Sequence, residues 1–381
     1  MQITFYLKQI AKMMMQQVYM PALYRSALKQ TKQVEKGLVL FADGHTAEGL
    51  LPFSMQKMHA YVESMPDYHT ECFVTDFGSL GYVGTLRWIR KFMKRYVACE
   101  YIFICNNFLP VSSCAKRPET TVIQLWHSGG ILKKSGYDTP DDIPKYYHGS
   151  VYQNYDMVTV SAPALVPIFT GFMRLSDGIV KATGTSRSDW YYDEEWNRMN
   201  QELFYKRYPQ AQGKKVIMWA PTFRGNAGDP ALYGMDAICN IMNKTSDRYF
   251  WLIKLHPHLE GRGISSNCDI PSERLLAVTD LMITDYSSIL FDYMAYKRPF
   301  VLFAPDRMQY EQQRGFYIDY ESFPTTIVSK EEDLEAAIAY ELSHRTAEDI
   351  EKAYAFHMAS CDGRSTERIW QQAQNCHKRN D

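Results

Sequence analysis

The chain has 381 residues, of which 46% are hydrophobic and 14% aromatic, and it carries a formal net charge of −1. A chain of this length and apolar content can bury a large core and is expected to form two domains. The near-neutral charge argues against nucleic acid as the main partner, because proteins that bind a phosphate backbone normally carry a marked basic excess.

The cysteines and the hydropathy pattern bear on compartment and membrane topology. The eight cysteines form no CxxC pair, and several lie in apolar runs such as 101–105, so they are interpreted as free buried thiols of a reducing compartment. There is no evident signal peptide and no apolar run near the roughly 20 residues that a membrane-spanning helix needs. The expected location is therefore inside the cell, without a spanning segment.

The first 36 residues have the pattern of amphipathic helices. Apolar residues recur at helical spacing up to Pro21, at Ile3, Leu7, Ile10, Met14 and Val18, and a cationic stripe follows, at Arg25, Lys29, Lys32 and Lys36. An apolar face flanked by cations is typical of a helix that lies at an anionic membrane surface. Residues 1–36 are thus predicted to associate with the membrane; the alternative is a helix that only packs on the domain.

From Gly37 onward, strand patterns alternate with helix patterns, which predicts an α/β fold. Strands are expected at 38–41, 70–75, 101–105, 121–126, 156–160, 216–219, 249–255, 281–284 and 300–303, and helices near 54–63, 85–96 and 193–207. The helix 193–207 is polar and ends before Pro209, and a new apolar strand follows it. We therefore predict two Rossmann-like domains, 37–208 and 209–381, that face each other across a cleft.

A histidine lies at the end of the predicted strand 121–126. His127 is followed by Gly129 and Gly130, which allow a tight turn and close approach to a ligand, and then by Lys133 and Lys134. A lone loop histidine is usually structural. Here a titratable base and two cations gather where α/β sheets hold their ligands, which favours a functional site.

Three strand ends in the second domain carry polar groups. Thr222 and Arg224 follow strand 216–219, Lys254 and His256 end strand 249–255, and Ser287 and Ser288 follow strand 281–284. Because parallel strands end at the same edge of a sheet, these groups predict a diphosphate site. Taken singly, Lys254 could be an edge residue that reaches solvent and Arg224 could form a surface ion pair.

The segment 280–305 reads as strand, helix and strand, which is a βαβ unit. Its helix begins near Ser287 or Ser288, where unpaired N–H groups would hold an anion. Asp292 lies one helical turn below Ser288 and is predicted to face the ligand side. The alternative is that the serines only cap the helix and Asp292 is a solvated surface acid.

Several of these motifs, taken together, resemble the CDP-glycerol glycerophosphotransferase family of teichoic acid synthesis. They are Trp126-His127 with Gly129-Gly130 and Lys133-Lys134, Ala220-Pro-Thr-Phe-Arg224, Lys254-Leu-His-Pro257, Thr284-Asp-Tyr-Ser-Ser288 with Phe291-Asp292, and Arg298-Pro299. The resemblance spans roughly residues 37–340. One departure is Ser128, where the family usually has a small alanine-like residue.

The resemblance implies a glycosyltransferase-B-like fold, CDP-glycerol as donor, a polyprenyl-diphosphate-linked saccharide or polyol-phosphate chain as acceptor, and peripheral attachment to the cytoplasmic face of the membrane. On this basis His127 is predicted to be the general base, and His256, Arg224 and the Ser287-Ser288 helix start are predicted to stabilise charge. Thr222 and Lys254 would also bind donor phosphate, Asp292 the ribose, and Gly129, Gly130, Lys133 and Lys134 the acceptor.

Some alternatives remain open at this point. The donor could be CDP-ribitol, or a nucleotide sugar on the same fold, and a membrane-bound assembly protein without enzymatic activity would keep the basic N-terminal helices. The chain has no DxD pair in a credible loop position, so a donor site without a dedicated metal or other cofactor is expected. Asp141-Asp142 is a weak metal candidate that is better interpreted as a solvated loop.

Overall fold

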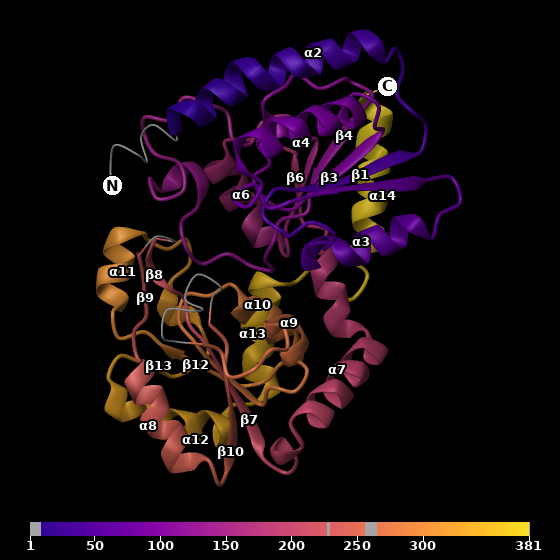
Figure 1. Ribbon diagram of the computed structural model, residues 1–381. Helices are drawn as coiled ribbons and strands as arrows, with labels where there is room; N and C mark the ends of the chain where they lie inside the picture. Colours follow the sequence, from indigo (N-terminus) through magenta and orange to yellow (C-terminus); the bar gives the residue numbers. More distant parts are fainter. Residues whose placement is uncertain (1–8, 227–228, 256–264, 381) are drawn as a thin grey trace. The chain divides into compact units, whose positions relative to one another are not determined.

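A computed structural model describes residues 9–226, 229–255 and 265–380, and these residues form two compact units. Unit 1 contains the described parts of Met1–His127, Ser135–Asp189 and Ser360–Asp381, and unit 2 those of Ser128–Lys134 and Trp190–Ala359. Each unit is built on a parallel sheet with helices packed beside it (Figure 1). The predicted α/β class with parallel sheets is therefore confirmed.

The sheet of unit 1 has, within the described residues, six parallel strands in the order β2-β1-β3-β4-β5-β6. Their bounds are Leu38–Asp43 (β1), His69–Val74 (β2), Tyr101–Ile104 (β3), Thr121–Gln124 (β4), Met157–Thr159 (β5) and Val180–Lys181 (β6). The inner strands β1, β3 and β4 are buried along their whole length, because helices cover both faces of a parallel sheet.

Helices of unit 1 flank this sheet. They are α2 (Met20–Gln30), α3 (Phe53–Glu63), α4 (Gly81–Tyr96), α5 (Leu109–Ser112), α6 (Val166–Met173) and α14 (Ser365–Asn380), with short turns η2 (Gly136–Asp138), η3 (Pro163–Leu165) and η4 (Ser186–Tyr192). From the C-terminal end of the chain, α14 adds Ile369, Trp370 and Ala373 to the core under β3 and β4. The last segment of the chain is thus part of the first unit.

The sheet of unit 2 has, in the part of the chain described, five parallel strands in the order β10-β7-β11-β12-β13. Their bounds are Lys215–Ala220 (β7), Tyr249–Ile253 (β10), Leu281–Thr284 (β11), Phe300–Phe303 (β12) and Ile327–Val328 (β13). A small antiparallel pair, β8 (Arg224–Asn226) and β9 (Asp229–Ala231), follows β7 and was not predicted. The strands that carry the three predicted site motifs, β10, β7 and β11, are neighbours, so their carboxyl ends share one edge.

The helices of unit 2 complete the fold. They are α7 (Glu194–Arg207), α8 (Met235–Thr245), α9 (Ser272–Leu275), α10 (Ile289–Tyr293), α11 (Arg307–Gln313), α12 (Leu334–His344) and α13 (Ala347–His357), with turns η5 (Pro209–Ala211), η6 (Met294–Tyr296), η7 (Tyr320–Ser322) and η8 (Glu331–Asp333). The predicted βαβ unit is present as β11, α10 with η6, and β12. Its helix is short, because only five residues are α-helical before the 3₁₀ turn.

The N-terminal segment is one helical stretch from residue 9 to residue 30, with a π-helical turn, η1 (Met15–Tyr19), just before Pro21. A wider turn at this point accommodates the proline, which lacks an N–H group and would clash with a carbonyl of the preceding turn. The helix ends at Gln30, where Thr31 is extended. The prediction of one cationic stripe is therefore wrong for Lys32 and Lys36, which lie in the connection to β1, and Ile3 and Leu7 lie outside the described residues.

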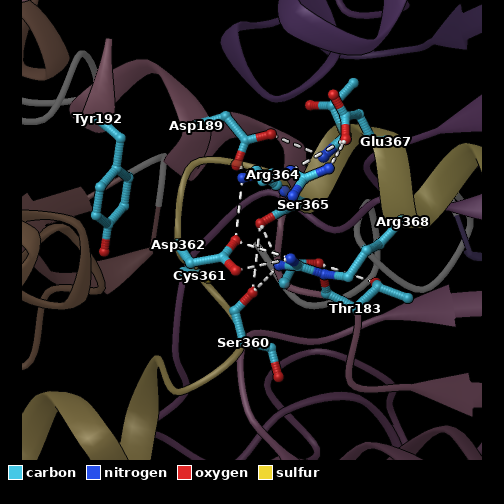
Figure 2. Close-up of polar contacts among 12 residues, drawn as sticks. Thr183, Asp189, Tyr192, Ser360, Cys361, Asp362, Arg364, Ser365, Glu367 and Arg368 are labelled. Atoms are coloured by element: carbon cyan, nitrogen blue, oxygen red, sulfur yellow. Dashed lines mark hydrogen bonds and ion pairs between the residues drawn. The ribbon is translucent and has the colours of Figure 1, made fainter. Parts of the chain in front are cut away.

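The boundary between the units differs from the predicted 208/209 boundary. Unit 2 already begins at Trp190, because α7 packs through Phe204 on Tyr208 and Phe250 of that unit. The chain returns to unit 1 at Ser360, where the Asp189 carboxylate accepts hydrogen bonds from the N–H groups of Ser365 (3.0 Å) and Thr366 (2.7 Å) at the start of α14 (Figure 2). These contacts join segments that are far apart in the sequence, so a local composition change could not reveal them.

Candidate functional site

His127 is placed by a bend of the backbone at the end of β4. Trp126 adopts a positive φ of 61°, a conformation that bulky side chains rarely take and that tends to persist at functional sites. The Trp126 ring is held by Phe169 and Phe172, at centroid distances of 5.2 and 5.8 Å. The His127 side chain is exposed, while its carbonyl accepts a hydrogen bond from Arg187. A fixed backbone thus presents this imidazole at the carboxyl edge of the sheet, as predicted.

The loop after His127 belongs to unit 2, which corrects its prediction as part of the acceptor domain. The Lys134 N–H donates to the Gly315 carbonyl (3.0 Å), and the Tyr317 N–H donates to the Leu132 carbonyl (2.8 Å). Gly130 separately allows the loop to approach α10, because a Cβ there would lie 2.6 Å from the Phe291 ring. The loop therefore packs on unit 2 through backbone pairing with a segment far away in the sequence and through the absence of a side chain at Gly130.

The loop after β7 is tied to the end of β11 in unit 2. Asp285 Oδ1 accepts hydrogen bonds from the N–H groups of Thr222 (2.8 Å) and Tyr286 (2.6 Å). Strand order reverses between β7 and β11, and doubly wound sheets bind ligands at such a switch point. The Thr222 hydroxyl is buried and has no hydrogen-bond partner among the described residues. A buried donor without a partner at this position fits a ligand-binding role.

Arg224 lies in a cage of carboxylates and rings. Its guanidinium contacts Asp285 Oδ2 (2.9 Å) and both oxygens of Asp306 (2.6 and 2.8 Å), and it lies 4.8 Å from the centre of the Tyr286 ring. Burial lowers the pKa of Arg224, but the two carboxylates outweigh this effect and raise it; burial likewise raises the pKa of Asp306, and Arg224 and Tyr286 bring it below its ordinary value.

Two negative charges therefore surround the one positive charge of Arg224. The guanidinium of Arg224 thus connects the segments that follow β7, β11 and β12. Its direct contact with the donor phosphate stays a prediction. The sequence analysis quoted Asp285 within the motif 284–288 without giving it a role, and it missed Asp306. The strand-end argument could have found Asp306, because it follows β12 by three residues in the same way that Ser287 follows β11 by three.

The strand-end motif after β10 is only partly described. The Lys254 ammonium donates to the Cys268 carbonyl (2.8 Å) and lines a pocket with Arg207, Tyr208 and Asp269, so its predicted phosphate contact would require this bond to be exchanged. His256 lies outside the described residues, and its predicted role stays a prediction.

The start of α10 is half-buried at Ser287 and Ser288. Ser288 occupies the N-cap position with helical backbone angles, and its side chain makes no capping hydrogen bond, so capping alone does not explain it. Asp292 is buried, with 1% of its surface exposed, which is incompatible with a solvated surface acid. A Cβ on Gly129 would lie 3.1 Å from Asp292 Oδ1. The loop that contains Gly129 therefore lies against α10, the helix that carries Asp292, and Asp292 is the residue predicted to bind the ribose.

An aromatic group with a further cation lies beside the lysine loop. Tyr286 and Tyr310 stack with centroids 4.0 Å apart, and Phe316 and Tyr320 stack at 5.5 Å. Arg314 donates from Nε to the Lys134 carbonyl (3.2 Å). The sequence analysis missed Arg314, since nothing near residue 314 indicates that residue 134 pairs with it.

The acidic pair 141–142 was considered as a metal candidate. Asp142 Oδ2 accepts a hydrogen bond from the Gly136 N–H (3.0 Å), which gives this carboxylate a role in the local turn. Among the described residues no group of three histidine, cysteine, aspartate or glutamate side chains has the spacing of a metal site. The expectation of a donor site without a dedicated metal stays a prediction.

The structure bears on two predictions, the burial of the cysteines and the absence of a membrane-spanning helix. All eight cysteines are free, as predicted; Cys72 is exposed and Cys239 is partly exposed, so the prediction of burial is wrong for Cys72. Within the described ranges, no helix combines the length and apolar character that crossing a bilayer requires.

Comparison with known proteins gives a consistent picture. The sequence model of the CDP-glycerol:poly(glycerophosphate) glycerophosphotransferase family matches residues 83–374. The teichoic acid ribitol-phosphate primase of Bacillus spizizenii is 30% identical over 77% of this chain and 79% of its own length. The teichoic acid glycerol-phosphate primase of Bacillus subtilis is 30% identical over 58% of this chain and 60% of its own length. The chain spans only 47% of the poly(ribitol-phosphate) polymerase of Bacillus spizizenii.

Solved structures extend the likeness to the fold of the chain. An H548A variant of the wall teichoic acid polymerase TagF superimposes with a TM-score of 0.73 over 99% of this chain and 98% of that chain, at 20% identity. A UDP-GlcNAc 2-epimerase from Neisseria meningitidis gives a TM-score of 0.60 over 90% of this chain and 100% of that chain, at 11% identity. At these identities the likeness concerns the fold alone.

Proposed function

Because the chain belongs to the CDP-glycerol:poly(glycerophosphate) glycerophosphotransferase family, we propose that it transfers glycerol phosphate from CDP-glycerol to a lipid-linked saccharide or polyol-phosphate acceptor in teichoic acid synthesis. The observation that carries the proposal is the gathering of polar groups at the switch point of unit 2. Thr222 follows β7, and Ser287 and Ser288 follow the adjacent β11; the buried Thr222 hydroxyl finds no hydrogen-bond partner in the part of the chain that the structure describes. This is where a parallel sheet holds a nucleotide diphosphate.

The reaction needs a base and a charge-stabilising donor site. The acceptor hydroxyl oxygen attacks the glycerol-bearing phosphorus, a new P–O bond forms, and the bond to the bridging oxygen breaks so that CMP leaves. In the proposal His127 takes the proton of the attacking hydroxyl; its exposure and its rigid attachment behind Trp126 support this role. His256 and the Ser287-Ser288 helix start would stabilise the charge that develops on the leaving oxygen.

The position of the lysine loop changes one assignment in this scheme. Gly129, Gly130, Lys133 and Lys134 were assigned to the acceptor, yet their loop pairs with 315–317 of unit 2. We propose that Lys134 and Arg314 instead place their positive charge beside the donor diphosphate. The acceptor role of this loop is thereby replaced by a donor role in the proposal, while Asp292 keeps its proposed contact with the ribose.

The proposal is tested by transfer to a short soluble acceptor, with the product mass and CMP release measured together. His127→Asn should lower kcat by roughly a hundredfold or more, which is the usual effect of removing a general base. His148→Asn, at another exposed histidine of unit 1, should transfer at the wild-type rate. Wild-type turnover in a folded His127→Asn protein would rule out the base.

A second candidate donor is CDP-ribitol. It is favoured by the ribitol-phosphate primase, which matches a larger share of this chain than the glycerol-phosphate primase does. Both donors share the CDP group, so the proposed diphosphate site serves either of them. Competition between CDP-glycerol and CDP-ribitol for one acceptor, with the product masses read out, decides between them.

The proposal places the enzyme at the cytoplasmic face of an anionic membrane. Met14 is 62% exposed, Arg25 and Lys29 are exposed on α2, and Ile10 is half-buried. Lys32 and Lys36 are also exposed, in the connection after the helix. The opposite face of the helix packs inward through Met20, Tyr24 and Ala27, so the segment both packs on its unit and leaves a second face available.

A further inference from the structure

Arg187, in the turn η4 that follows β6, contacts the main chain beside the proposed base. Its guanidinium Nη1 donates to the His127 carbonyl and to Ser54 Oγ (3.2 Å), and the guanidinium carbon lies 5.2 Å from the centre of the Phe53 ring. Ser54 is buried in the first turn of α3. One side chain of unit 1 thus connects the end of β4 with the start of α3.

The turn that carries Arg187 is held on both sides by the C-terminal segment of unit 1. Before it, Ser186 Oγ and Thr366 Oγ1 share a hydrogen bond of 2.9 Å, and both residues are buried. After it, the Asp189 carboxylate accepts hydrogen bonds from the N–H groups of Ser365 and Thr366 at the start of α14 (Figure 2). The backbone at Arg187 is therefore fixed between two anchored neighbours, which sets the point from which its guanidinium reaches His127.

The main chain of His127 is thereby restrained on both sides. Before it, the Trp126 N–H donates to the side chain of Gln124 (2.9 Å) rather than to a neighbouring strand, and the Trp126 ring packs against two phenylalanines of α6. After it, the His127 carbonyl is held by Arg187. Because peptide units are planar, the direction of a side chain is set by the angles φ and ψ of its own residue, and a hydrogen bond to the carbonyl restricts ψ.

We propose that Arg187 is a positioning residue for His127: by holding the His127 carbonyl, it fixes the direction in which the imidazole points toward the acceptor hydroxyl. This inference rests on the proposed function, in which His127 takes the proton of that hydroxyl, and it adds a residue to which the sequence analysis gave no role. Arginine suits the task, because Nη1 of its planar guanidinium carries two N–H donors, one for the His127 carbonyl and one for the Ser54 hydroxyl.

The rival role for the same cation is direct binding of an anionic acceptor. A group that binds the acceptor acts whether or not the base is present, whereas a positioning residue acts only through the base. The contacts favour positioning, because the guanidinium is engaged by the main chain of His127 and by the start of α3. The two roles therefore differ in how the effects of changing Arg187 and His127 combine, and this difference can be measured.

The test uses the full chain and transfer from CDP-glycerol or CDP-ribitol to a short soluble acceptor, with kcat and the KM of each substrate measured. Arg187→Met keeps a long side chain and removes the N–H donors. Its kcat should fall by roughly tenfold to a hundredfold, because a displacement of about 1 Å in a catalytic group can cost on the order of a hundredfold. Both KM values should stay as in the wild type, since a positioning residue contacts neither substrate.

The decisive comparison is made without the base. His127→Asn and the double variant His127→Asn/Arg187→Met should have the same residual kcat, because Arg187 then has no imidazole to position. A double variant that loses the full factor of Arg187→Met a second time would overturn the inference, since Arg187 would then act independently of His127. A raised acceptor KM with wild-type kcat in Arg187→Met would overturn it as well and would assign Arg187 to acceptor binding.

A matched control comes from another arginine of unit 1 that holds backbone carbonyls. Arg117 donates to the carbonyls of Thr31 and Lys32, away from the end of β4, so Arg117→Met loses the same kind of bond and should keep the wild-type kcat. Circular dichroism checks the folding of each variant. If Arg187→Met does not fold, Phe53→Leu/Ser54→Ala replaces it, because this variant keeps Arg187 and removes the two supports of its guanidinium; a lower kcat at unchanged acceptor KM supports the inference, and a wild-type kcat overturns it.

The proposed function and the positioning role fail in different ways. A wild-type protein that transfers neither glycerol phosphate nor ribitol phosphate would refute the proposed function and the positioning role together. A wild-type protein that transfers, next to a folded Arg187→Met that transfers equally fast, would overturn the positioning role alone. Wild-type turnover in His127→Asn would remove the base from the proposed function, and the role of Arg187 would be refuted with it.

Discussion

His357 lies between the rings of Phe291 and Phe323 in unit 2, with centroid distances of 4.9 and 5.2 Å, and only 2% of its surface is exposed. Burial lowers its pKa to about 4. The pKa of a histidine in an unfolded chain is about 6.5. Between pH 6.5 and 4 the imidazole of His357 is therefore protonated in the unfolded state and neutral in the folded state. The stability contribution is therefore complete above pH 6.5 and is lost as the pH falls toward 4.

The predicted consequence is a loss of unfolding free energy of up to about 3 kcal/mol for unit 2 over this interval, from the shift of the pKa of His357. His357→Phe keeps an aromatic ring in the same position and should flatten the pH dependence. Urea unfolding at several pH values measures the pH dependence of the unfolding free energy. The control is His344→Phe, which replaces an exposed histidine and should leave this pH dependence as in the wild type. An equally steep pH dependence in His357→Phe and the wild type would contradict the assignment.

Arg224 and Asp306 form a buried pair whose partners should be energetically coupled. Their side chains are 11% and 10% exposed, and their hydrogen bonds are 2.6 and 2.8 Å long. Removing one partner of a buried pair costs about 3–5 kcal/mol, because the other charge is left uncompensated. Arg224→Met should destabilise unit 2 by roughly this amount, and Asp306→Asn should destabilise it by less, because Asp285 still pairs with Arg224.

The double variant should cost clearly less than the sum of the two single variants, because Asp306 has already lost its cation in Arg224→Met and its replacement then removes an uncompensated charge, while Asp285 loses Arg224 in both proteins. Urea unfolding of all four proteins gives the coupling energy. Strict additivity would mean that the contact contributes nothing to stability. Sequence reasoning named Arg224 from its strand-end position; the same argument could have named Asp306 as a strand-end residue but not as the partner of Arg224, because residue 306 meets residue 224 only through the order of the strands.

At the scale of elements, most of the strands followed from local pattern. Most strands of the two parallel sheets were predicted because parallel strands that are buried on both faces form continuous apolar runs, as in Phe300–Phe303, whereas the two-residue edge strands β6 and β13 were not predicted. The short β8 and β9 pair has no such run and was missed. The packing of residues 128–134 on 315–317 depends on backbone pairing between distant segments, and no local property of either segment encodes it.

One buried carboxylate of unit 1 contacts the start of α14, in addition to the apolar packing of this helix. Asp189 is 3% exposed and receives the N–H groups of Ser365 and Thr366, which are otherwise without partners in the first turn of the helix (Figure 2). Asp189→Ala should lower the unfolding free energy of unit 1 by about 2–4 kcal/mol, because two buried donors lose charge-assisted bonds.

This prediction is checked by hydrogen exchange, in which the amides of α14 should lose protection while those of β7 and β11 in unit 2 keep theirs. Asp177→Ala changes an exposed acid of the same unit and should leave all amides as in the wild type. Unchanged protection of α14 in Asp189→Ala would show that the apolar face of the helix suffices for its docking.

For the whole molecule, the division into units decides which fragments can fold. The sequence boundary assigns residues 209–381 to one domain, whereas the described contacts assign α7 to unit 2 and α14 to unit 1. A fragment 209–381 would lack α7, whose Phe204 is fully buried against Tyr208 and Phe250. It would also carry α14 with Ile369 and Trp370 uncovered.

We therefore expect the fragment 209–381 to aggregate, because it exposes two apolar surfaces at once. The fragment 190–359 keeps α7, omits α14 and exposes less apolar surface, so it should be the more soluble of the two and should retain helical and strand signals in circular dichroism. Size-exclusion chromatography of both fragments at equal concentration compares them. A monomeric, cooperatively unfolding 209–381 fragment alongside an aggregated 190–359 fragment would show that the sequence boundary, and not the contact boundary, separates the folding units.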